Sequence, residues 1–382
     1  MRGSDVDFEF EAGKPRRIVV KVGTRLVIDT DGQPQHDFLS RTAREIRGLM
    51  DQGIEVLLVT SGAVGIGRRI IFDRPGRLLR VNERPSAAAV GQPILMRYWA
   101  EAMADVGITC AQVLLTQDDV VNRRRCMRLR ETLEDLLNWD VLPVLNENDS
   151  ISTEAVTFGE NDLMAAMVAV AITPAELLVM LSDQAGLFTA DPRSNEDAEL
   201  ICEVKPHEDV GRFASGAGGP ESLGGMSKKV EAARRATDCG IRVVIADGNA
   251  DRVLERILKE EQVGTCMFPR PRMPSRKAWL AMHLMPSGTL VVDEGAKRAL
   301  LHPDGASLLP SGITGVRGDF REGDLVIVRD SAGREIARGL VNYSSKEATA
   351  IMGAQSSEIA ERIGREGEAE VIHRDDMVIS AP

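Results

Sequence analysis

Two lysines in this chain occupy positions that suit contact with a phosphate group. Lys21 follows an apolar β-branched run and comes shortly before Gly23, which would let a ligand approach the backbone closely. Lys229 closes the segment 223–229, Leu-Gly-Gly-Met-Ser-Lys-Lys, which leads into a predicted helix from about Met226. Lysines in the first turn of a helix oppose its dipole, so a bound phosphate explains them better than a solvated surface does. For Lys21 taken alone, the alternative is a lysine that reaches from a strand end into water.

Amide and carboxylate side chains gather at two further places. The apolar run Val141–Leu145 predicts a buried strand, and it leads straight into Asn146–Asp149, Asn-Glu-Asn-Asp. After a short loop, the residues Gly159–Asp162 open a helical pattern. The end of a strand and the start of a helix are the places where α/β proteins bind ligands. Asx-rich turns and an ordinary N-cap are the alternative for either group alone, but two groups that flank one loop favour a binding site.

Two weaker signals accompany these groups. The segment Val59–Gly67, Val-Thr-Ser-Gly-Ala-Val-Gly-Ile-Gly, places Ser61 and small residues before a predicted helix whose free amides can hold an anion. Its spacing fits neither the dinucleotide-binding pattern nor the P-loop pattern. Ser182 and Asp183 follow the apolar run Leu177–Leu181, where an ordinary loop explains them equally well. Histidines and cysteines show no ligand spacing, so we predict no metal site built from protein side chains.

Alternating strand and helix patterns must position these side chains. From Arg17 to Gly264, apolar strand-like runs alternate with helical patterns, which predicts an α/β fold: a parallel sheet with helices on both faces, an αβα sandwich. Beyond it, short segments broken by glycine and proline predict a small β-rich domain. We therefore expect four parts: a disordered leader, 1–14; the α/β domain, 15–267; a proline-rich linker, 268–279; and the β-rich domain, 280–380.

The composition is that of an ordinary globular protein. Of the 382 residues, 43% are hydrophobic and 27% are charged, and no apolar run approaches the roughly 18 residues that a membrane span requires. The net charge of −11 argues against broad binding of nucleic acid or of a membrane surface. Because the first residues are acidic and lack a signal-peptide pattern, we expect a cytoplasmic protein. Five scattered cysteines without a Cys-x-x-Cys pair are expected to be reduced.

Six segments stand in this order along the α/β domain: IVVKVGT, VTSGAVGIG, VLPVLNEND, GEND, LSDQAGLFTADPR and GGMSKK. Together they resemble the amino-acid kinase family, and within it the branch that phosphorylates L-glutamate. The resemblance continues beyond the linker. There the segments GTLVVDEGAKRAL, SLLPSGITGV, GDFREGDLVIV and HRDDMV resemble the PUA domain that many members of this branch carry at the C-terminus.

The resemblance implies an enzyme that transfers the γ-phosphoryl group of ATP to the side-chain carboxylate of L-glutamate. The products would be L-glutamyl 5-phosphate and ADP, in the first step of L-proline biosynthesis. The resemblance also implies Mg²⁺ that bridges the ATP phosphates, proline as a feedback inhibitor, and a homo-oligomer. Phosphoryl transfer needs mainly charge stabilisation at the moving group, which suits two lysines and Mg²⁺.

The same resemblance assigns roles to the residues at matching positions. The catalytic group would consist of Lys21 and Lys229, which contact phosphate, and of Asp162, which organises both lysines. The residues expected to bind L-glutamate are Ser61, Asp149 and Asn161. The residues expected to bind ATP are Lys21, Ser182, Asp183, Leu223, Gly224, Gly225, Met226, Ser227, Lys228 and Lys229.

The sequence departs from the family pattern at several positions. Leu223 and Lys228 stand where the family usually has threonine, and Glu160 stands where it usually has aspartate. The segment after Asp162 is also one residue short. These changes bear on glutamate affinity and nucleotide contacts, and they leave the reaction class unchanged.

Two other functions fit parts of the pattern. One is another small-molecule kinase of the same fold, although Asp149 and Asn161 favour a substrate with an ammonium group. The other is an RNA-binding or regulatory protein that has lost catalysis and uses its PUA-like domain. Residues 287–382 hold 11 lysines and arginines against 16 aspartates and glutamates, a net charge of −5, which argues against RNA binding.

Overall fold

The computed structural model describes most of the chain. The described residues are 13–72, 80–152, 161–192, 194–206, 208, 220–271, 277, 280, 282, 286–302 and 305–380. The predicted leader lies outside this set except for Gly13 and Lys14, and of the predicted linker only residues 268–271 and 277 are described. The chain divides into two compact units, Met1–Arg272 and Met273–Pro382.

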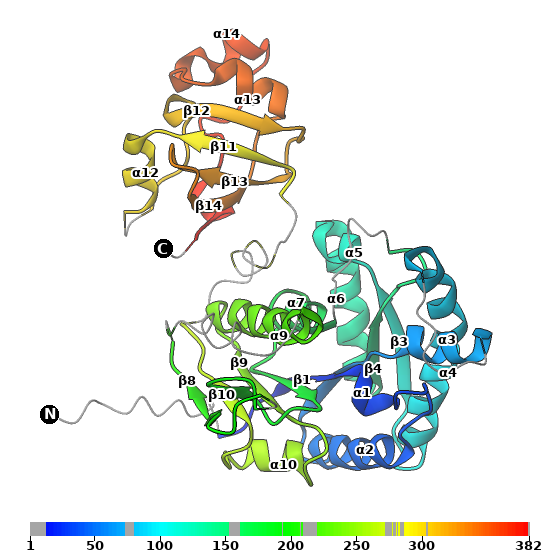
Figure 1. Cartoon of the computed structure of the whole chain (residues 1–382). Helices are drawn as coiled ribbons and strands as arrows, with labels where there is room; N and C mark the ends of the chain where they lie inside the picture. Colours follow the sequence, from blue (N-terminus) through cyan, green and yellow to red (C-terminus); the bar gives the residue numbers. More distant parts are fainter. Residues whose placement is uncertain are drawn as a thin grey trace, which may run out of the picture. The chain divides into compact units, whose positions relative to one another are not determined.

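An eight-stranded sheet forms the centre of the first unit (Figure 1), with the strand order β3-β4-β2-β1-β5-β9-β10-β8. Its neighbouring strands pair in parallel, except that β9 and β10 are antiparallel. The predicted parallel sheet is therefore confirmed, with one short antiparallel strand added. The strands are β1 Arg17–Val22, β2 Glu55–Val59, β3 Cys110–Leu115, β4 Leu142–Glu147, β5 Leu177–Ser182, β8 Glu203–Val204, β9 Arg242–Asp247 and β10 Thr265–Met267, and β6 Leu187–Phe188 pairs with β7 Leu200–Ile201 outside the sheet.

Helices cover both faces of this sheet (Figure 1), as predicted for an αβα sandwich. Helices α2, α4 and α10 pack on one face, against Ile18, Val20 and Val22 of β1, and α6, α7 and α9 lie over the other face. All six residues of β1 are buried, because successive side chains point to opposite faces and both faces are covered. The helices are α1 Thr24–Val27, α2 His36–Met50, α3 Ala63–Phe72, α4 Arg84–Ala104, α5 Gln117–Val121, α6 Arg123–Asn138, α7 Asn161–Met167 with the π-helix η3 Val168–Ile172, α9 Pro220–Asp238 and α10 Val253–Leu258.

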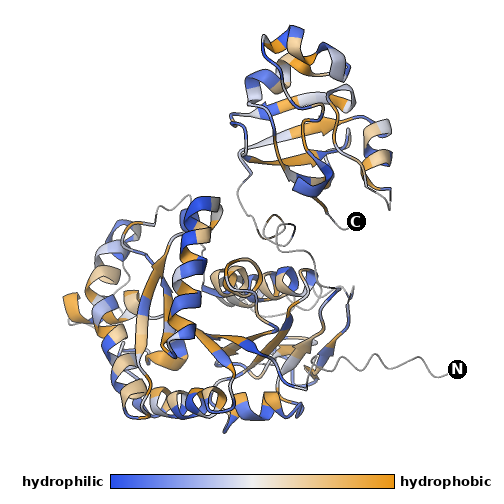
Figure 2. Cartoon of the chain, turned by 180° about the vertical axis from the view of Figure 1, so that it is seen from behind, coloured by the Kyte–Doolittle hydropathy of each residue, from blue (hydrophilic) through white to orange (hydrophobic). Residues whose placement is uncertain are grey.

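The second unit is built on a five-stranded sheet with the order β12-β11-β13-β14-β15. It has a hydrophobic core of its own, which includes Leu290, Phe320 and Tyr343. Figure 2 shows apolar residues, in orange, concentrated on the strands of both sheets. The elements are β11 Gly288–Val292, α12 Glu294–Leu300, β12 Ile313–Gly318, β13 Leu325–Arg329, β14 Glu335–Leu340, α13 Ser345–Ile351, α14 Ile359–Ile363 and β15 Met377–Ile379. Within the described residues, no helix of either unit combines the length and apolar character that a membrane span requires.

Helix α9 begins earlier than the sequence pattern indicates. It starts at Pro220, so Leu223–Gly225 lie inside it and Lys229 lies in its third turn. Proline is favoured at the start of a helix, where its missing N–H group has no partner in any case. The prediction that Lys228 and Lys229 occupy the first turn is therefore wrong, and so is the dipole argument for a phosphate that was based on it.

Helices α3 and α4 approach closely at two glycines. A Cβ atom on Gly67 would lie 1.7 Å from the carbonyl oxygen of Ala87, and a Cβ atom on Gly91 would lie 1.8 Å from that of Ala63. Both contacts are with backbone atoms, which cannot move aside as a flexible side chain can. The glycines thus hold α3, which begins two residues after Ser61, against α4.

We expect Gly91→Ala to lower the free energy of unfolding by at least about 1–3 kcal/mol, because the added methyl group would push the two helices apart. Gly48→Ala in α2 is the matched control, since its Cβ atom would meet nothing within 4 Å. In the interior of a helix this control should gain about 0.5–1 kcal/mol. Urea unfolding of both variants tests the contact, and equal stabilities would contradict it.

Candidate active site

A cleft of about 500 Å³ opens at the carboxyl ends of β1, β2, β4 and β5. Along the chain, β2 follows β1 on one side of the sheet, whereas β5 and β9 are added on the other side. The strand order therefore reverses beside β1. In open α/β sheets, ligands bind outside the carboxyl ends of the strands at this kind of reversal.

Most of the residues that the sequence singles out meet in this cleft. Its lining includes Lys21, Ser61, Asp149, Asn161, Asp162, Ser182, Asp183, Met226 and Lys229. Ser227 and Lys228 are exposed on α9 and do not belong to the lining. The side chains of Leu223–Gly225, and Glu160 as a whole, lie outside the described residues. The structure thus brings the two lysines and the two polar groups together, while the role of each residue stays a prediction.

Lys21, Asp162 and Lys229 form a buried cluster at the base of the cleft. The Nζ atom of Lys21 lies 2.6 Å from Oδ1 of Asp162, and the Nζ atom of Lys229 lies 2.9 Å from Oδ1 and 3.0 Å from Oδ2. The three side chains come from β1, from the first turn of α7 and from α9. At most 8% of any of them is exposed. One carboxylate thus holds two ammonium groups side by side.

The charges of this cluster follow from its contacts. Burial by itself would raise the pKa of Asp162, but the charges of Lys229 and Lys21 and their hydrogen bonds lower it to about 2. The carboxylate is therefore ionised at neutral pH. Two ammonium groups and one carboxylate leave a net charge of about +1 in a buried place, which attracts an anion strongly because the surroundings screen it little.

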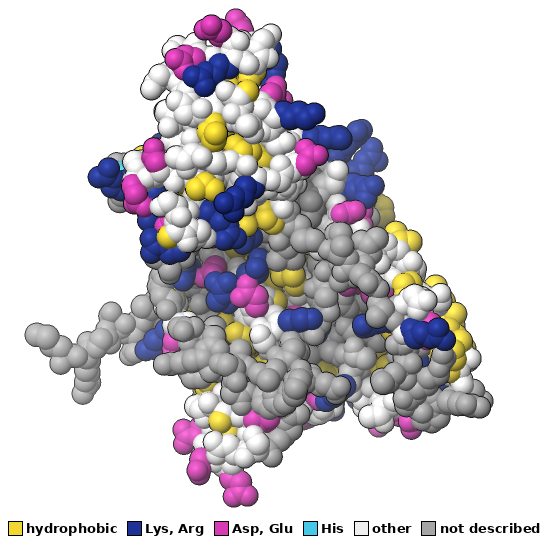
Figure 3. Space-filling view, turned by 45° about the horizontal axis from the view of Figure 1, so that its top comes forward, with side chains coloured by type: hydrophobic (Ala, Val, Ile, Leu, Met, Phe, Trp, Pro, Cys, Tyr) yellow, Lys and Arg dark blue, Asp and Glu magenta, His cyan; other side chains and the backbone are white. Residues whose placement is uncertain are grey.

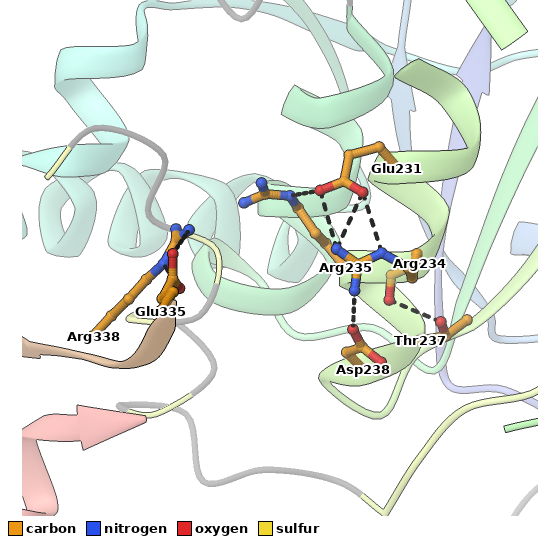
Figure 4. A network of polar contacts seen from close by, with 7 residues as sticks. All are labelled: Glu231, Arg234, Arg235, Thr237, Asp238, Glu335 and Arg338. Carbon is orange, nitrogen blue, oxygen red and sulfur yellow. Dashed lines mark hydrogen bonds and ion pairs between the residues drawn. The ribbon is translucent and has the colours of Figure 1, made fainter. Parts of the chain in front are cut away.

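Lys229 reaches the cleft from helix α9, which is held in place along its length. Val230, Ala233 and Ala236 are buried beneath it. On its outer side, Glu231 accepts hydrogen bonds from Arg234 and Arg235, and Arg234 also bonds to Asp238 (Figure 4). Exposed ion pairs contribute little energy each, so the buried alanines and valine must hold the helix in place.

Asn161 lies at the centre of a partly buried hydrogen-bond network. Its Nδ2 atom lies 2.5 Å from the carbonyl oxygen of Thr60, 2.9 Å from Oγ of Ser61 and 2.7 Å from Oδ1 of Asn146. An amide nitrogen carries only two hydrogens, so it can donate to two of these acceptors at once. The hydroxyl of Ser61 also keeps its own hydrogen to donate to a ligand.

A second layer of side chains fixes this network. Asn146 donates through Nδ2 to Oε1 of Gln92 at 2.7 Å, and Trp99 donates through Nε1 to Oγ1 of Thr60 at 2.8 Å. Gln92 and Trp99 both belong to α4, two turns apart, and both are buried. Helix α4 therefore determines how the amide of Asn161 is oriented.

Charged side chains of both signs line the outer part of the cleft. Burial raises the pKa of Asp149, and the positive charge of Arg84 partly offsets that effect. On another wall, Arg25 forms an ion pair of 2.9 Å with Asp183. These groups surround the buried cluster with sites for a charged ligand.

The comparison with known families agrees with this arrangement. The model described as the amino acid kinase family matches residues 16–247, which is more than half of the chain. This chain belongs to the amino acid kinase family. The first unit is therefore the kinase unit, and residues 288–363 of the second unit match the PUA domain.

Relatives of this kinase align along nearly its whole length. A protein of Nitrobacter winogradskyi named glutamate 5-kinase is 43% identical over 371 residues, which cover 97% of this chain and 97% of that protein. A protein of Nitrosomonas eutropha with the same name is 44% identical over 370 residues, which cover 95% of this chain and 97% of that protein. A protein of Trichlorobacter lovleyi, also named glutamate 5-kinase, is 42% identical over 366 residues, which cover 95% of this chain and 96% of that protein.

Sequence reasoning missed several residues of this kinase site. Gln92, Trp99 and Arg84 were given no role in the site, and Asn146 was noted only as part of the polar group 146–149. A polar residue at a core-facing position of a helix is a signal that could have found Gln92, because Ala88, Leu95 and Trp99 on the same helix are buried. Buried polar groups need partners, so such a residue indicates a network.

We expect Gln92→Met to raise the KM for the phosphoryl acceptor about 3- to 10-fold, because losing one hydrogen bond of about 1 kcal/mol would leave Asn146 free to turn. The KM for ATP should stay the same. Arg97→Met is the control, because it introduces the same methionine side chain at an exposed position of the same helix. Steady-state kinetics of both variants test the network. An unchanged acceptor KM in Gln92→Met would show that Gln92 only fills space.

Proposed function

We propose that this kinase transfers the γ-phosphoryl group of ATP to the side-chain carboxylate of L-glutamate. The products are L-glutamyl 5-phosphate and ADP, and the reaction is the first step of L-proline biosynthesis. The relatives named glutamate 5-kinase, which align over 95% or more of the chain, support this proposal. The observation that carries it is the cluster of Lys21, Asp162 and Lys229 in a cleft that is also lined by hydroxyl, amide and carboxylate side chains.

The two lysines stabilise the phosphoryl group while it moves. Transfer of a phosphoryl group requires little covalent chemistry from the protein and much stabilisation of charge on the equatorial oxygens. Lys21 and Lys229 both bond to Oδ1 of Asp162, which keeps their ammonium groups in place between reaction cycles. Lys21 also contacts the phosphates of ATP, and Ser182, Asp183 and the segment 223–229 of α9 bind the nucleotide.

The acceptor needs no general base. The side-chain carboxylate of glutamate is ionised at neutral pH, so its oxygen attacks phosphorus without losing a proton. Asp162 is unsuited to be a base, since its pKa of about 2 keeps it ionised and both of its oxygens are bonded to lysines. Asp149 binds the ammonium group of glutamate. Ser61 and Asn161 bind other polar atoms of the same glutamate molecule.

The side chains of the cleft suit ATP that carries Mg²⁺. Mg²⁺ neutralises charge on the phosphates and keeps several waters, and it often takes only one or two protein carboxylates. Among the described residues no group of three metal-ligating side chains comes together, which fits an ion held mainly through phosphate oxygens. The net positive charge of the lysine cluster fits the phosphate groups themselves.

Trapping the acyl phosphate with hydroxylamine tests this function. The enzyme with ATP, Mg²⁺ and L-glutamate should form the γ-hydroxamate in step with ADP, and L-aspartate in place of glutamate should form far less. ADP without hydroxamate would point to a different acceptor, which is the alternative of another small-molecule kinase. No nucleotide-dependent product with any acceptor would favour the alternative of a protein that has lost catalysis.

The RNA-binding alternative has little support in the second unit. On the face visible in Figure 3, acidic side chains lie among the basic ones over this unit. The net charge of −5 over residues 287–382 also argues against binding of a phosphate backbone.

Regulation and assembly extend the proposal. Proline, like glutamate, carries a positively charged nitrogen and a carboxylate on its α-carbon, so we propose that it inhibits by binding to Asp149. A homo-oligomer is supported by Ile70 and Ile71 on α3, which are 45% and 43% exposed. The dependence on ATP supports a cytoplasmic location.

The kinase unit is proposed to work without the second unit. All described residues that line the cleft lie between Lys21 and Lys229, and the second unit has its own core. A protein that ends at residue 267 should therefore keep its fold and most of its kcat. A soluble, folded truncation without activity would contradict this.

A further inference from the structure

Arg84 has no role in the reaction described so far, although it lines the cleft. It is the first residue of α4, its side chain is exposed, and it shares the cleft wall with Ser61, Asp149 and Asn161. A cation in the first turn of a long helix opposes the helix dipole, so its placement there costs stability. Within the described part of the chain, Arg84 forms no ion pair that would offset this cost.

The other cations of the cleft are already engaged. Among the described lining residues, four carry a positive charge. Lys21 and Lys229 hold Asp162, and Arg25 pairs with Asp183 at 2.9 Å. Arg84 is the remaining cation, and it lies on the side of the cleft where Asp149 is located.

Arg84 and Asp149 form a pair of opposite charges that face one space. The positive charge of Arg84 acts on the carboxylate of Asp149 without a direct ion pair between them. Both side chains line the same cleft, so a ligand in it can contact the two groups at once. An α-amino acid carries an ammonium group and a carboxylate on one carbon atom, which is the charge pattern that complements Asp149 and Arg84.

We infer that Arg84 binds the α-carboxylate of the acceptor amino acid, while Asp149 binds its ammonium group. This inference rests on the proposed function. The planar guanidinium of arginine can donate two parallel hydrogen bonds to a carboxylate, which fixes orientation as well as position. With its α-carbon held at both groups, the substrate extends its side-chain carboxylate toward Lys21 and Lys229.

The start of α4 is a firm base for such a contact. Eight residues further along, Gln92 connects the same helix to Asn146 and Asn161, and Gly91 holds it against α3. One helix thus positions the group for the α-carboxylate and the amides beside it. The site selects for acceptors that carry an α-carboxylate.

A comparison of two acceptors tests this role. 4-Aminobutyrate is glutamate without the α-carboxylate, and it keeps the ammonium group and the reacting carboxylate. Arg84→Met should lower kcat/KM for L-glutamate about 10- to 100-fold, mainly through KM, as expected when a charge-assisted hydrogen bond is lost. For 4-aminobutyrate, the same change should alter kcat/KM by less than about twofold, because this ligand has no group that binds Arg84. If 4-aminobutyrate is not turned over, its inhibition constant against glutamate phosphorylation should likewise change by less than about twofold.

Further variants complete the test. Arg84→Lys should recover part of the loss, and Arg97→Met on the same helix should behave as wild type. In Arg84→Met the KM for ATP should be unchanged and the melting temperature should not fall, because the lost cation opposed the dipole of α4. An unchanged KM for glutamate, or an equal loss with both acceptors, would overturn the inference. A wild-type enzyme that forms no hydroxamate from glutamate would instead refute the proposed function, so the two failures are distinct.

Discussion

Asp162→Asn is expected to lower kcat by about 10²- to 10³-fold, the scale on which a preorganised charge in an active site contributes. The carboxylate holds Lys21 at 2.6 Å and Lys229 at 2.9 Å, and an asparagine cannot accept from both as an anion does. The two ammonium groups would then repel each other and move apart. Steady-state kinetics at saturating ATP and glutamate measure the effect. A variant with nearly normal kcat would show that Asp162 only caps α7.

The same substitution should also lower the free energy of unfolding, by about 3–5 kcal/mol, because it removes the anion that two buried lysines share. The pKa of Asp162 falls from 3.8 to about 2 on folding, so its contribution is present above pH 4 and is lost as the pH falls toward 2. The stability difference between wild type and Asp162→Asn should therefore shrink between pH 4 and pH 2. Asp51→Asn, at an exposed ion pair of α2, is the control.

Lys21→Met and Lys229→Met should each lower kcat by about 10²- to 10³-fold, because each removes one of the two charges that stabilise the moving phosphoryl group. Combining Lys21→Met with Asp162→Asn should lose much less than the product of the two single losses, since both changes damage one cluster. Lys259→Met, at an exposed ion pair of α10, is the matched control. Fully multiplicative losses would mean that the three residues act independently.

The sheet and its helices could be predicted from the sequence because their signals are local. Runs such as Ile18–Val20 and Leu177–Leu181 are apolar at every position, which indicates strands buried on both faces. Strand β10 escaped prediction, because its three residues are too short to show a period and a proline-rich segment follows. The start of α9 was misplaced, because two glycines that usually end a helix lie inside it.

The candidate site was only partly predictable, for a related reason. Lys21 and Asp162 are recognisable as polar residues at the end of a strand and at the start of a helix, whereas Lys229 was noticed because of a helix start that the structure places nine residues before this lysine. The contact of both lysines with one carboxylate depends on the tertiary structure, because the chain segments that carry the three residues are far apart in sequence. Gln92 reads as part of an ordinary helix until its partner Asn146 is seen. The role of Arg84 likewise becomes apparent only when the structure shows that Asp149 lines the same cleft.

Isotope transfer tests most directly the central claim that a carboxylate oxygen attacks the γ-phosphorus. L-glutamate labelled with ¹⁸O in its side-chain carboxylate would be incubated with ATP and Mg²⁺, and the acyl phosphate would be cleaved with hydroxylamine. Hydroxylamine attacks the carbonyl carbon, so the bridging oxygen leaves with phosphate. We predict inorganic phosphate that carries one ¹⁸O atom, seen in its ³¹P NMR shift, in amounts equal to the ADP formed. Unlabelled phosphate alongside ADP would contradict direct transfer to the glutamate side chain.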